Sequence, residues 1–311
     1  MSDFRGITKQ LPHCHFDPAL DSSASSLAFA KAYLQFYQID FEQQLPGVSH
    51  YMGKLSSAGY DIACHYLIPQ KPRATVFVVH GYYDHVGLFG HLIRFLLKRN
   101  YAVAAFDLPG HGLSSGEPAA IDSFSTYSKV LEDVVQAAHT LPKPFYAVGQ
   151  STGCAVILGL QAEATCFEKR VLLAPLIRPW HWHKGVWKYR LLKYFVHSIK
   201  RKLIDNSADK AFLEFVHHRD PLQAQHLTVS WVGAMKAWID GFETLKVCPA
   251  HTLIIQGKKD QTVDWRNNIP MLQKKIPDAH IQFFDEADHH LVNESAPLRE
   301  MVFEKVAEFF G

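Results

Sequence analysis

The sequence predicts an α/β protein with a mostly parallel central sheet flanked by helices and a helical cap inserted after the sixth strand. Short, continuously apolar runs alternate with helical patterns along most of the chain, which is typical of strands buried on both faces of a parallel sheet. Residues 178–239 interrupt this alternation. We therefore expect a core of residues 1–177 and 240–311, with 1–48 as an N-terminal extension containing a helix, and a cap of residues 178–239.

The expected elements follow along the chain. Residues 24–40 have the apolar spacing of a helix, and residues 49–69 contain two strand-like runs around a turn at Ser56-Ser57-Ala58-Gly59. Later strands are predicted at 74–81, 101–110, 144–151, 170–177, 251–260 and 281–290. Helices are predicted at 87–99, 121–140 and 152–164, and after each of the last two strands.

The composition is that of an ordinary folded protein. Of 311 residues, 48% are apolar and 20% are charged, and the formal net charge is +2. These values exclude a disordered or collagen-like chain and argue against a dedicated nucleic-acid binder. We expect no transmembrane helix and no secretory signal, because the chain lacks a long apolar run and its first residues lack an apolar segment.

The cysteines are scattered and contain no CxxC pair, so we expect a reduced, cytoplasmic setting. They are Cys14, Cys64, Cys154, Cys166 and Cys248.

The cap segment is rich in aromatic and basic residues. Its tryptophans are Trp180, Trp182, Trp187, Trp231 and Trp238, and residues 178–204 contain eight Lys/Arg and no Asp or Glu. An aromatic cap can cover an acyl chain, which makes Trp180, Trp182 and Trp187 candidates for substrate binding. A basic face with large aromatics can also contact a membrane or micelle. The ordinary alternative is a packed cap whose charges face water.

Gly149-Gln150-Ser151-Thr152-Gly153 is the strongest chemical signal. A G-x-S-x-G between a predicted strand and a predicted helix is typical of a nucleophile elbow, where the glycines are needed because strand and helix crowd the serine. A serine hydroxyl becomes a good nucleophile only beside a base that a carboxylate orients. We predict Ser151 as the nucleophile, with an acid and then a histidine later in the chain.

Asp260 and a histidine at 289–290 are the predicted partners of Ser151. Asp260 follows the strand at 251–260 and is preferred to Asp264 because it lies nearer the strand end. The base must lie in Asp288-His289-His290, and His289 and His290 cannot both point at Ser151.

Two backbone N–H groups are expected to bind the oxyanion of the tetrahedral intermediate. One belongs to Thr152, directly after the nucleophile. The other is expected from Tyr82, in the loop His80–His85, where Gly81 allows the backbone to approach closely.

Four motifs in chain order carry a resemblance to a known family. They are His80-Gly81, Asp107-Leu108-Pro109-Gly110-His111-Gly112-Leu113-Ser114, Gly149 to Gly153, and Ala287-Asp288-His289. Over about residues 50–311 the sequence resembles the α/β-hydrolase superfamily, in the branch of monoacylglycerol lipases, bacterial lysophospholipases and serine aminopeptidases.

The resemblance implies the α/β-hydrolase fold, a loop beside the site ordered by the second motif, and His289 rather than His290 as the base. The chain departs from the branch at two positions, with Glu286 in place of the glycine of G-A-x-H and Asp84 in place of the glutamate of H-G-x-x-E-H.

The leading functional hypothesis is a serine ester hydrolase acting through an acyl-enzyme on a lipid-like ester such as a monoacylglycerol or lysophospholipid. Amide hydrolysis by an aminopeptidase is the alternative, and it is disfavoured because a substrate amine needs cap acids. The cap offers only Asp205, Asp209, Glu214 and Asp220. A non-catalytic binding protein is a third possibility, disfavoured by the complete set of Ser151, Asp260 and His289.

We expect no cofactor and no metal. The pairs His13–His15, His181–His183 and His217–His218 have no third ligand at a metal-binding spacing.

Overall fold

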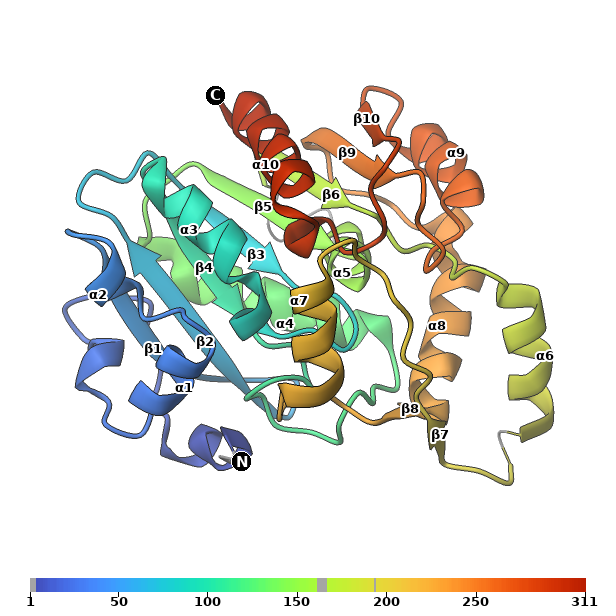
Figure 1. The fold of residues 1–311 in the computed structure, drawn as a ribbon, viewed down its shortest axis with the longest axis horizontal. Coiled ribbons are helices and arrows are strands. Elements are labelled where there is room, and N and C mark those ends of the chain that lie inside the picture. The colour runs from blue at the N-terminus through green and yellow to red at the C-terminus, as the bar shows by residue number, and fades with distance from the viewer. Residues whose placement is uncertain (1–3, 161–166, 193) are drawn as a thin grey trace.

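The computed structural model describes residues 4–160, 167–192 and 194–311 (Figure 1). Its centre is an eight-stranded sheet in the order β1-β2-β4-β3-β5-β6-β9-β10. The strands are β1 (Ser49–Ser57), β2 (Tyr60–Ile68), β3 (Ala74–Val79), β4 (Tyr101–Phe106), β5 (Phe145–Gln150), β6 (Lys169–Leu173), β9 (His251–Gly257) and β10 (His280–Phe284). Only the pairs β1–β2 and β2–β4 of this sheet are antiparallel, so the predicted α/β class with a mostly parallel sheet is confirmed.

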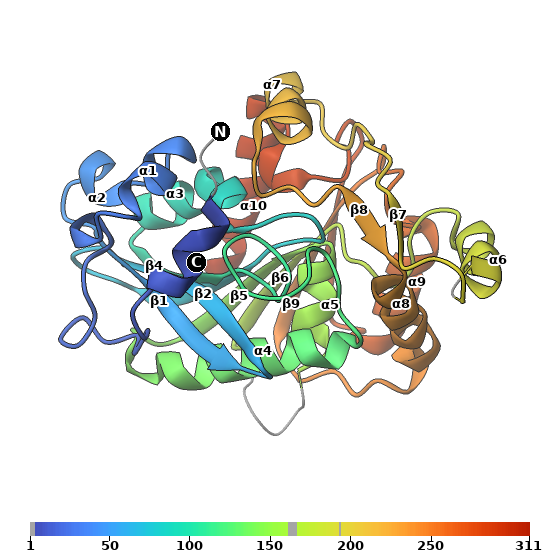
Figure 2. The ribbon, with the colours of Figure 1, turned by 90° about the horizontal axis from the view of Figure 1, so that it is seen from below.

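Helices cover both faces of the sheet, which explains why the parallel strands are apolar throughout. Figure 2 shows α3 (Gly90–Lys98) and α10 (Ala296–Phe310) on one side, and α4 (Phe124–Ala137) and α5 (Thr152–Leu158) on the other. The helix α9 (Trp265–Lys275) follows β9. A separate cluster of buried apolar side chains fills the space on each face.

The N-terminal extension differs from the predicted single helix over 24–40. It contains 3₁₀ turns at Phe4–Gln10 and Ala24–Ser26, and two short helices, α1 (Lys31–Phe36) and α2 (Phe41–Gln44). The serines at the start explain the break, since serine side chains compete with helical hydrogen bonds. Ser23 Oγ donates to the carboxylate of Glu42, and Ser26 Oγ donates to the carbonyl of Ser23.

Between the sixth strand and β9 the chain forms α6 (Trp182–Leu192), β7 (Ser198–Lys200), α7 (Lys210–Glu214), β8 (His226–Thr228) and α8 (Val229–Gly241). The strands β7 and β8 pair with each other and not with the central sheet. The helix α6 packs against α8, and Figure 1 shows the two side by side beyond the sheet. Residues 161–166 and Lys193 lie outside the described residues. The end of the helix predicted over 152–164 falls within the first of these gaps.

The cysteines differ from the reduced set that the spacing predicts. Cys14, Cys64 and Cys154 are buried free thiols, but Cys248 is disulfide-bonded. Sequence spacing misses such a bond because disulfide formation depends on distances in the folded chain. Cys166 lies outside the described residues. Among the described helices, none has the length and apolar character needed to cross a membrane.

Candidate active site

Ser151 occupies a strained turn between β5 and α5, as the elbow motif predicts. Its φ is 55° and its ψ is −111°, a conformation that non-glycine residues seldom adopt. Only glycine fits at positions 149 and 153, because a side chain there would collide with neighbouring backbone atoms. A Cβ on Gly149 would lie 2.7 Å from the Gly153 carbonyl carbon, and one on Gly153 would collide with the carbonyl oxygen of Val79. The turn therefore holds Ser151 at the carboxyl end of a central strand.

The structure brings the side chains of Asp260 and His289 together. His289 Nδ1 lies 2.8 Å from Asp260 Oδ2, and both side chains are buried. Asp260 Oδ1 accepts the N–H groups of Thr262 at 2.7 Å and Val263 at 3.0 Å. Burial raises the pKa of Asp260, but the charge and hydrogen bond of His289, together with the bonds from the Val263 N–H and Gln256 Nε2, outweigh burial and lower the pKa below its usual value. The ionised carboxylate thus fixes the proton of His289 on Nδ1 and leaves Nε2 as the basic nitrogen.

The two rival residues point elsewhere. Asp264 precedes α9 and pairs with the Arg178 guanidinium. His290 Nε2 lies 3.1 Å from Asp84 Oδ1 in a buried pair. Asp264 and His290 thus each have a charged partner other than the pair formed by Asp260 and His289.

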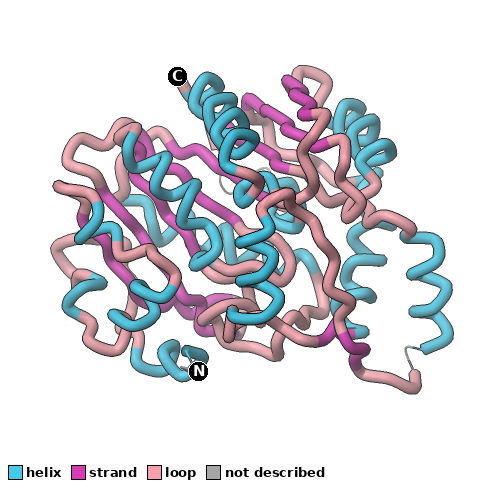
Figure 3. The backbone as a smooth tube through the Cα atoms, in the orientation of Figure 1, coloured by secondary structure: helices cyan, strands magenta, loops and turns pink. Residues whose placement is uncertain are grey.

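The loop that carries His289 is tied to the elbow and to the segment before α7. Gln150 Nε2 donates to the carbonyl of His289 at 2.9 Å. The carbonyl of Asn206 accepts the N–H groups of His289 at 3.1 Å and His290 at 2.8 Å. Figure 3 shows the stretch between β7 and α7 that includes Asn206 as a loop. Glu294 Oε1 accepts the Asp288 N–H at 2.6 Å and so fixes the residue before His289.

The loop His80–His85 lies directly against the elbow. A Cβ on Gly81 would lie 3.4 Å from Ser151 Cβ. Within the described residues, no protein acceptor takes the N–H of Tyr82 or of Thr152, the first residue of α5. The Tyr82 ring stacks on Trp231 of α8 with centroids 3.8 Å apart, and its hydroxyl donates to the Ala119 carbonyl at 2.7 Å. Both predicted donors are thus available beside Ser151.

Asp107 orders the loop of the second motif. Its two carboxylate oxygens accept the N–H groups of Val86 and Leu113, each at 2.7 Å. His80 Nε2 accepts the N–H of Leu108 at 2.8 Å. The loops after β3 and β4 are therefore locked together.

Asp220, between α7 and β8, supports the loop His80–His85, a role different from the capture of a substrate amine that the sequence suggested for the cap acids. Its carboxylate contacts His85 Nε2 at 3.0 Å and the Tyr37 hydroxyl at 2.6 Å. It also accepts Gln223 Nε2, which donates in addition to the carbonyl of Tyr83 at 3.0 Å. Burial raises its pKa, but the charge and hydrogen bond of His85 prevail and hold the pKa of Asp220 at about 2. An isolated Asp without a motif around it gives no sequence signal for this role.

Among the described residues, no hydrogen bond or ring contact joins the three candidate tryptophans to Ser151, Asp260 or His289. The Trp180 ring lies near His181 and Arg266, and Trp182 is half-buried. Trp187 is 63% exposed. The described residues also contain no group of three or more His, Cys, Asp or Glu placed to hold a metal ion.

Comparisons with known proteins agree with this architecture. The serine aminopeptidase S33 family matches residues 70–296. A monoglyceride lipase homolog of Monkeypox virus is 26% identical, covering 79% of this chain and 92% of that protein. The monoglyceride lipase of Rattus norvegicus is 25% identical, covering 81% and 87%.

Solved structures show the same fold. A soluble variant of monoglyceride lipase from Saccharomyces cerevisiae, bound to a substrate analog, superposes with a TM-score of 0.72 at 17% identity, covering 83% of this chain and 93% of that one. The monoacylglycerol lipase of Paleococcus ferrophilus gives 0.65 at 18% identity, covering 84% and 99%. The family match spans well over half of the chain, and the chain belongs to the serine aminopeptidase S33 family of α/β-hydrolases, on its monoacylglycerol lipase branch.

Proposed function

We propose that this serine ester hydrolase cleaves lipid-like carboxylic esters, such as monoacylglycerols or lysophospholipids, through a Ser151–His289–Asp260 triad. The observation that carries the proposal is the pairing of His289 with a buried, ionised Asp260, in a loop that Gln150 ties to the strained elbow at Ser151. The names of the relatives, which are monoglyceride lipases, support an ester of glycerol as the substrate class.

In this mechanism Ser151 Oγ attacks the ester carbonyl while His289 Nε2 takes its proton. The Tyr82 and Thr152 N–H groups bind the oxyanion of the tetrahedral intermediate. His289 then gives the proton to the leaving alcohol, and an acyl-enzyme remains on Ser151. Water, deprotonated by His289, attacks the acyl carbonyl and releases the carboxylic acid. Asp260 keeps its charge throughout and stabilises the imidazolium.

The acids of the segment 178–239 argue against the aminopeptidase alternative. Asp220 is fully engaged by His85, Tyr37 and Gln223. Asp209 caps α7 by accepting the N–H groups of Ala211 and Phe212. Asp205 and Glu214 are exposed. None of the four is held as a buried, unpaired carboxylate, which the capture of a substrate amine at the site would require.

A panel of p-nitrophenyl esters of rising chain length, assayed beside aminoacyl anilides, tests the substrate class. We expect turnover of the esters, with the preference rising from acetate to medium chains, and negligible cleavage of the anilides. Anilide hydrolysis at a rate equal to that of the best ester would favour the aminopeptidase. A protein inert to both would favour the non-catalytic binding protein.

We further propose that residues 178–239 act as a cap whose outer face contacts micelles or membranes. Exposed apolar side chains gather along α6 and the chain that follows it. They are Trp187, Leu191, Tyr194, Phe195, Ile199, Leu203 and Ile204. Lys184, Lys200 and Lys202 are exposed among them. Arg201 does not belong to this face, because its guanidinium lies 3.7 Å from the Tyr83 ring centre and donates to Gln223.

Salt dependence tests this contact, because exposed charges are screened over about 10 Å at 0.1 M salt. Activity on anionic lysophospholipid micelles should fall as salt rises, while activity on a short soluble ester should stay constant. Lys200→Gln with Lys202→Gln should reproduce the fall on micelles only, and Lys274→Gln, an exposed lysine of α9, is the control. Equal salt responses for the two substrates would reject the contact.

We also propose that the protein is located in the cytoplasm. The free thiols of Cys14, Cys64 and Cys154 support it, and the disulfide at Cys248 counts against it. Cell fractionation of the tagged protein tests the location.

A further inference from the structure

A large pocket lies at the edge of the sheet opposite the candidate active site. It has a volume of about 850 Å³, and its lining includes residues at the amino ends of β6 and β9. Asp260 follows the carboxyl end of β9, a strand of seven residues. At about 3.3 Å per residue, roughly 20 Å of strand separates the pocket from the proposed triad. A ligand in this pocket would therefore not touch Ser151 or His289.

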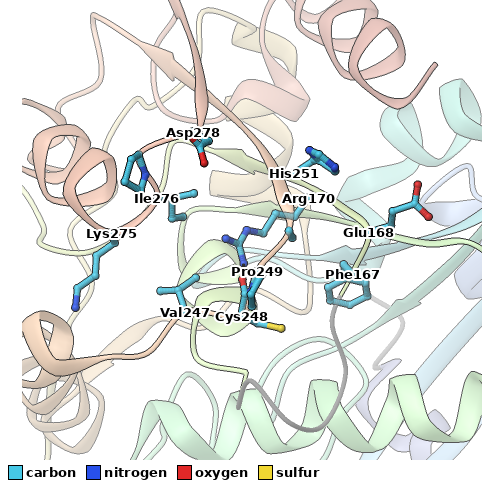
Figure 4. Close-up of a pocket in the computed structure, with 12 residues that line it drawn as sticks. Phe167, Glu168, Arg170, Val247, Cys248, Pro249, His251, Lys275, Ile276 and Asp278 are labelled. Carbon is cyan, nitrogen blue, oxygen red and sulfur yellow. Dashed lines mark hydrogen bonds between the residues drawn. The ribbon is translucent and has the colours of Figure 1, made fainter.

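The floor of the pocket contains a buried guanidinium. Arg170 is only 2% exposed, yet it lines the pocket, and Figure 4 shows its guanidinium lying among Val247, Pro249 and Ile276. Nε donates to Thr252 Oγ1 and Nη1 donates to the Cys248 carbonyl, both at 2.8 Å. These two bonds leave three of the five guanidinium N–H donors without a protein acceptor among the described residues.

Arg170 also has no acidic partner. In the part of the chain that the structure describes, it forms no ion pair with a carboxylate. Burial alone lowers the pKa of Arg170 to about 10, so the side chain still carries its charge at neutral pH. A buried cation without a counter-ion is costly, and such groups are normally paired.

The other charges of the pocket lie closer to solvent. Glu168, Asp278 and His251 are exposed at its rim, so they do not neutralise the guanidinium on the floor. Lys275 Nζ donates to the carbonyls of Glu243 and Leu245, which are neutral acceptors and leave its charge unopposed. The walls between floor and rim are largely apolar, from Phe167, Val247 and Ile276.

We propose that this pocket binds a carboxylate-bearing amphiphile. The carboxylate would take the free donors of Arg170 in the bidentate manner that suits a guanidinium, and the apolar part would lie against Val247 and Ile276. This is a second ligand site, distinct from the acyl site of the proposed function and independent of it.

Isothermal titration of the full-length protein with decanoate tests the proposal, with acetate and 1-decanol as probes that carry only the charge or only the chain. Decanoate should bind at least tenfold more tightly than either. Arg170→Gln should weaken the binding of decanoate tenfold or more. Thr252→Val, which removes one acceptor of Arg170 but keeps the charge, should bind decanoate nearly as well as the wild type. Lys275→Gln should weaken binding by a smaller factor, and Lys274→Gln should not.

Decanoate can also enter an acyl site, so only the binding that Arg170→Gln removes is assigned to the pocket. Val247→Trp, which fills the apolar wall without touching the guanidinium, should abolish the same binding and leave esterase activity intact. It also replaces Arg170→Gln if that variant does not fold. Unchanged decanoate affinity in either variant, or no binding to the wild type below about 1 mM, would overturn the proposal.

Discussion

Asp220 Oδ2 and His85 Nε2 lie 3.0 Å apart in a pair with almost no exposed surface. The pair joins the segment 178–239 to the loop that carries Tyr82, and the Tyr37 hydroxyl attaches the N-terminal extension to the same carboxylate. Burial disfavours the charged form of His85 and lowers its pKa. The nearby carboxylate of Asp220 outweighs burial, so the pKa of the His85 imidazole is raised. Three parts of the chain that are distant in sequence thereby hold the proposed oxyanion loop in place.

Replacing Asp220 by Asn should disturb this loop. The amide keeps the shape but removes the charge, and breaking a buried pair costs about 3 kcal/mol of unfolding free energy. We expect kcat for a short ester to fall about tenfold with little change in KM, because the oxyanion donors act mainly in the transition state. Asp205→Asn, at an exposed position, is the control. A variant that loses stability but retains full kcat would show that the pair is structural only.

The stability of the protein should fall steeply in acid. The pKa values of Asp84 and Asp220 are held at about 2 by the charges of His290 and His85, which outweigh burial. A carboxylate with a depressed pKa contributes stability above its unfolded pKa, near 4, and loses it as the pH falls toward its folded pKa. Urea unfolding should show that, between pH 5 and pH 2, the free energy of unfolding falls less for Asp220→Asn than for the wild type. Parallel curves would contradict the depressed pKa.

Alanine at His289 and at His290 should have different effects. His289→Ala should lower kcat/KM by about 10⁴ or more and leave the fold intact. His290→Ala should keep most of the turnover but lower stability by about 3 kcal/mol, because the buried Asp84 loses its partner. Steady-state kinetics and urea unfolding on both variants separate the two effects. The reverse ranking of the kinetic losses would reassign the base.

Asparagine at Asp260 and at Asp264 should also have different effects on kcat. Asp260→Asn should cost about 10⁴ in kcat, because the amide favours the wrong tautomer of His289. Asp264→Asn should leave kcat near the wild-type value and affect only its pairing with Arg178. Comparable losses at the two positions would remove the basis for placing Asp260 in the triad.

The sheet could be predicted from the sequence, but several features around it could not. Strands buried on both faces, such as β3 and β5, produce continuous apolar runs that periodicity detects. The helix predicted over 24–40 is shorter in the structure, Lys31–Phe36, and the bond from Ser23 to Glu42 beside its start involves a residue beyond the predicted element. The pair Asp220–His85 spans 135 positions, so it leaves no local pattern. The sequence spacing also does not predict the disulfide at Cys248, because disulfide formation depends on distances in the folded chain.

The G-x-S-x-G motif predicts the turn at Ser151 because the constraints on that turn are local. The turn that holds Ser151 needs glycines two residues away on each side, and the sequence shows both. The sequence alone separates Asp260 from Asp264 only by distance from the strand end, because both follow the same strand and their contacts depend on the loop conformation.

Labelling with a fluorophosphonate probe tests the central claim most directly, since the probe reacts only with an activated serine. The account predicts one covalent adduct per chain, located by peptide mass spectrometry at Ser151, with loss of esterase activity in proportion to labelling. Ser151→Ala should take up no probe and should lose activity by about 10⁴ or more while keeping its fold. Labelling at a different serine, or an alanine variant with near-wild-type turnover, would contradict the account.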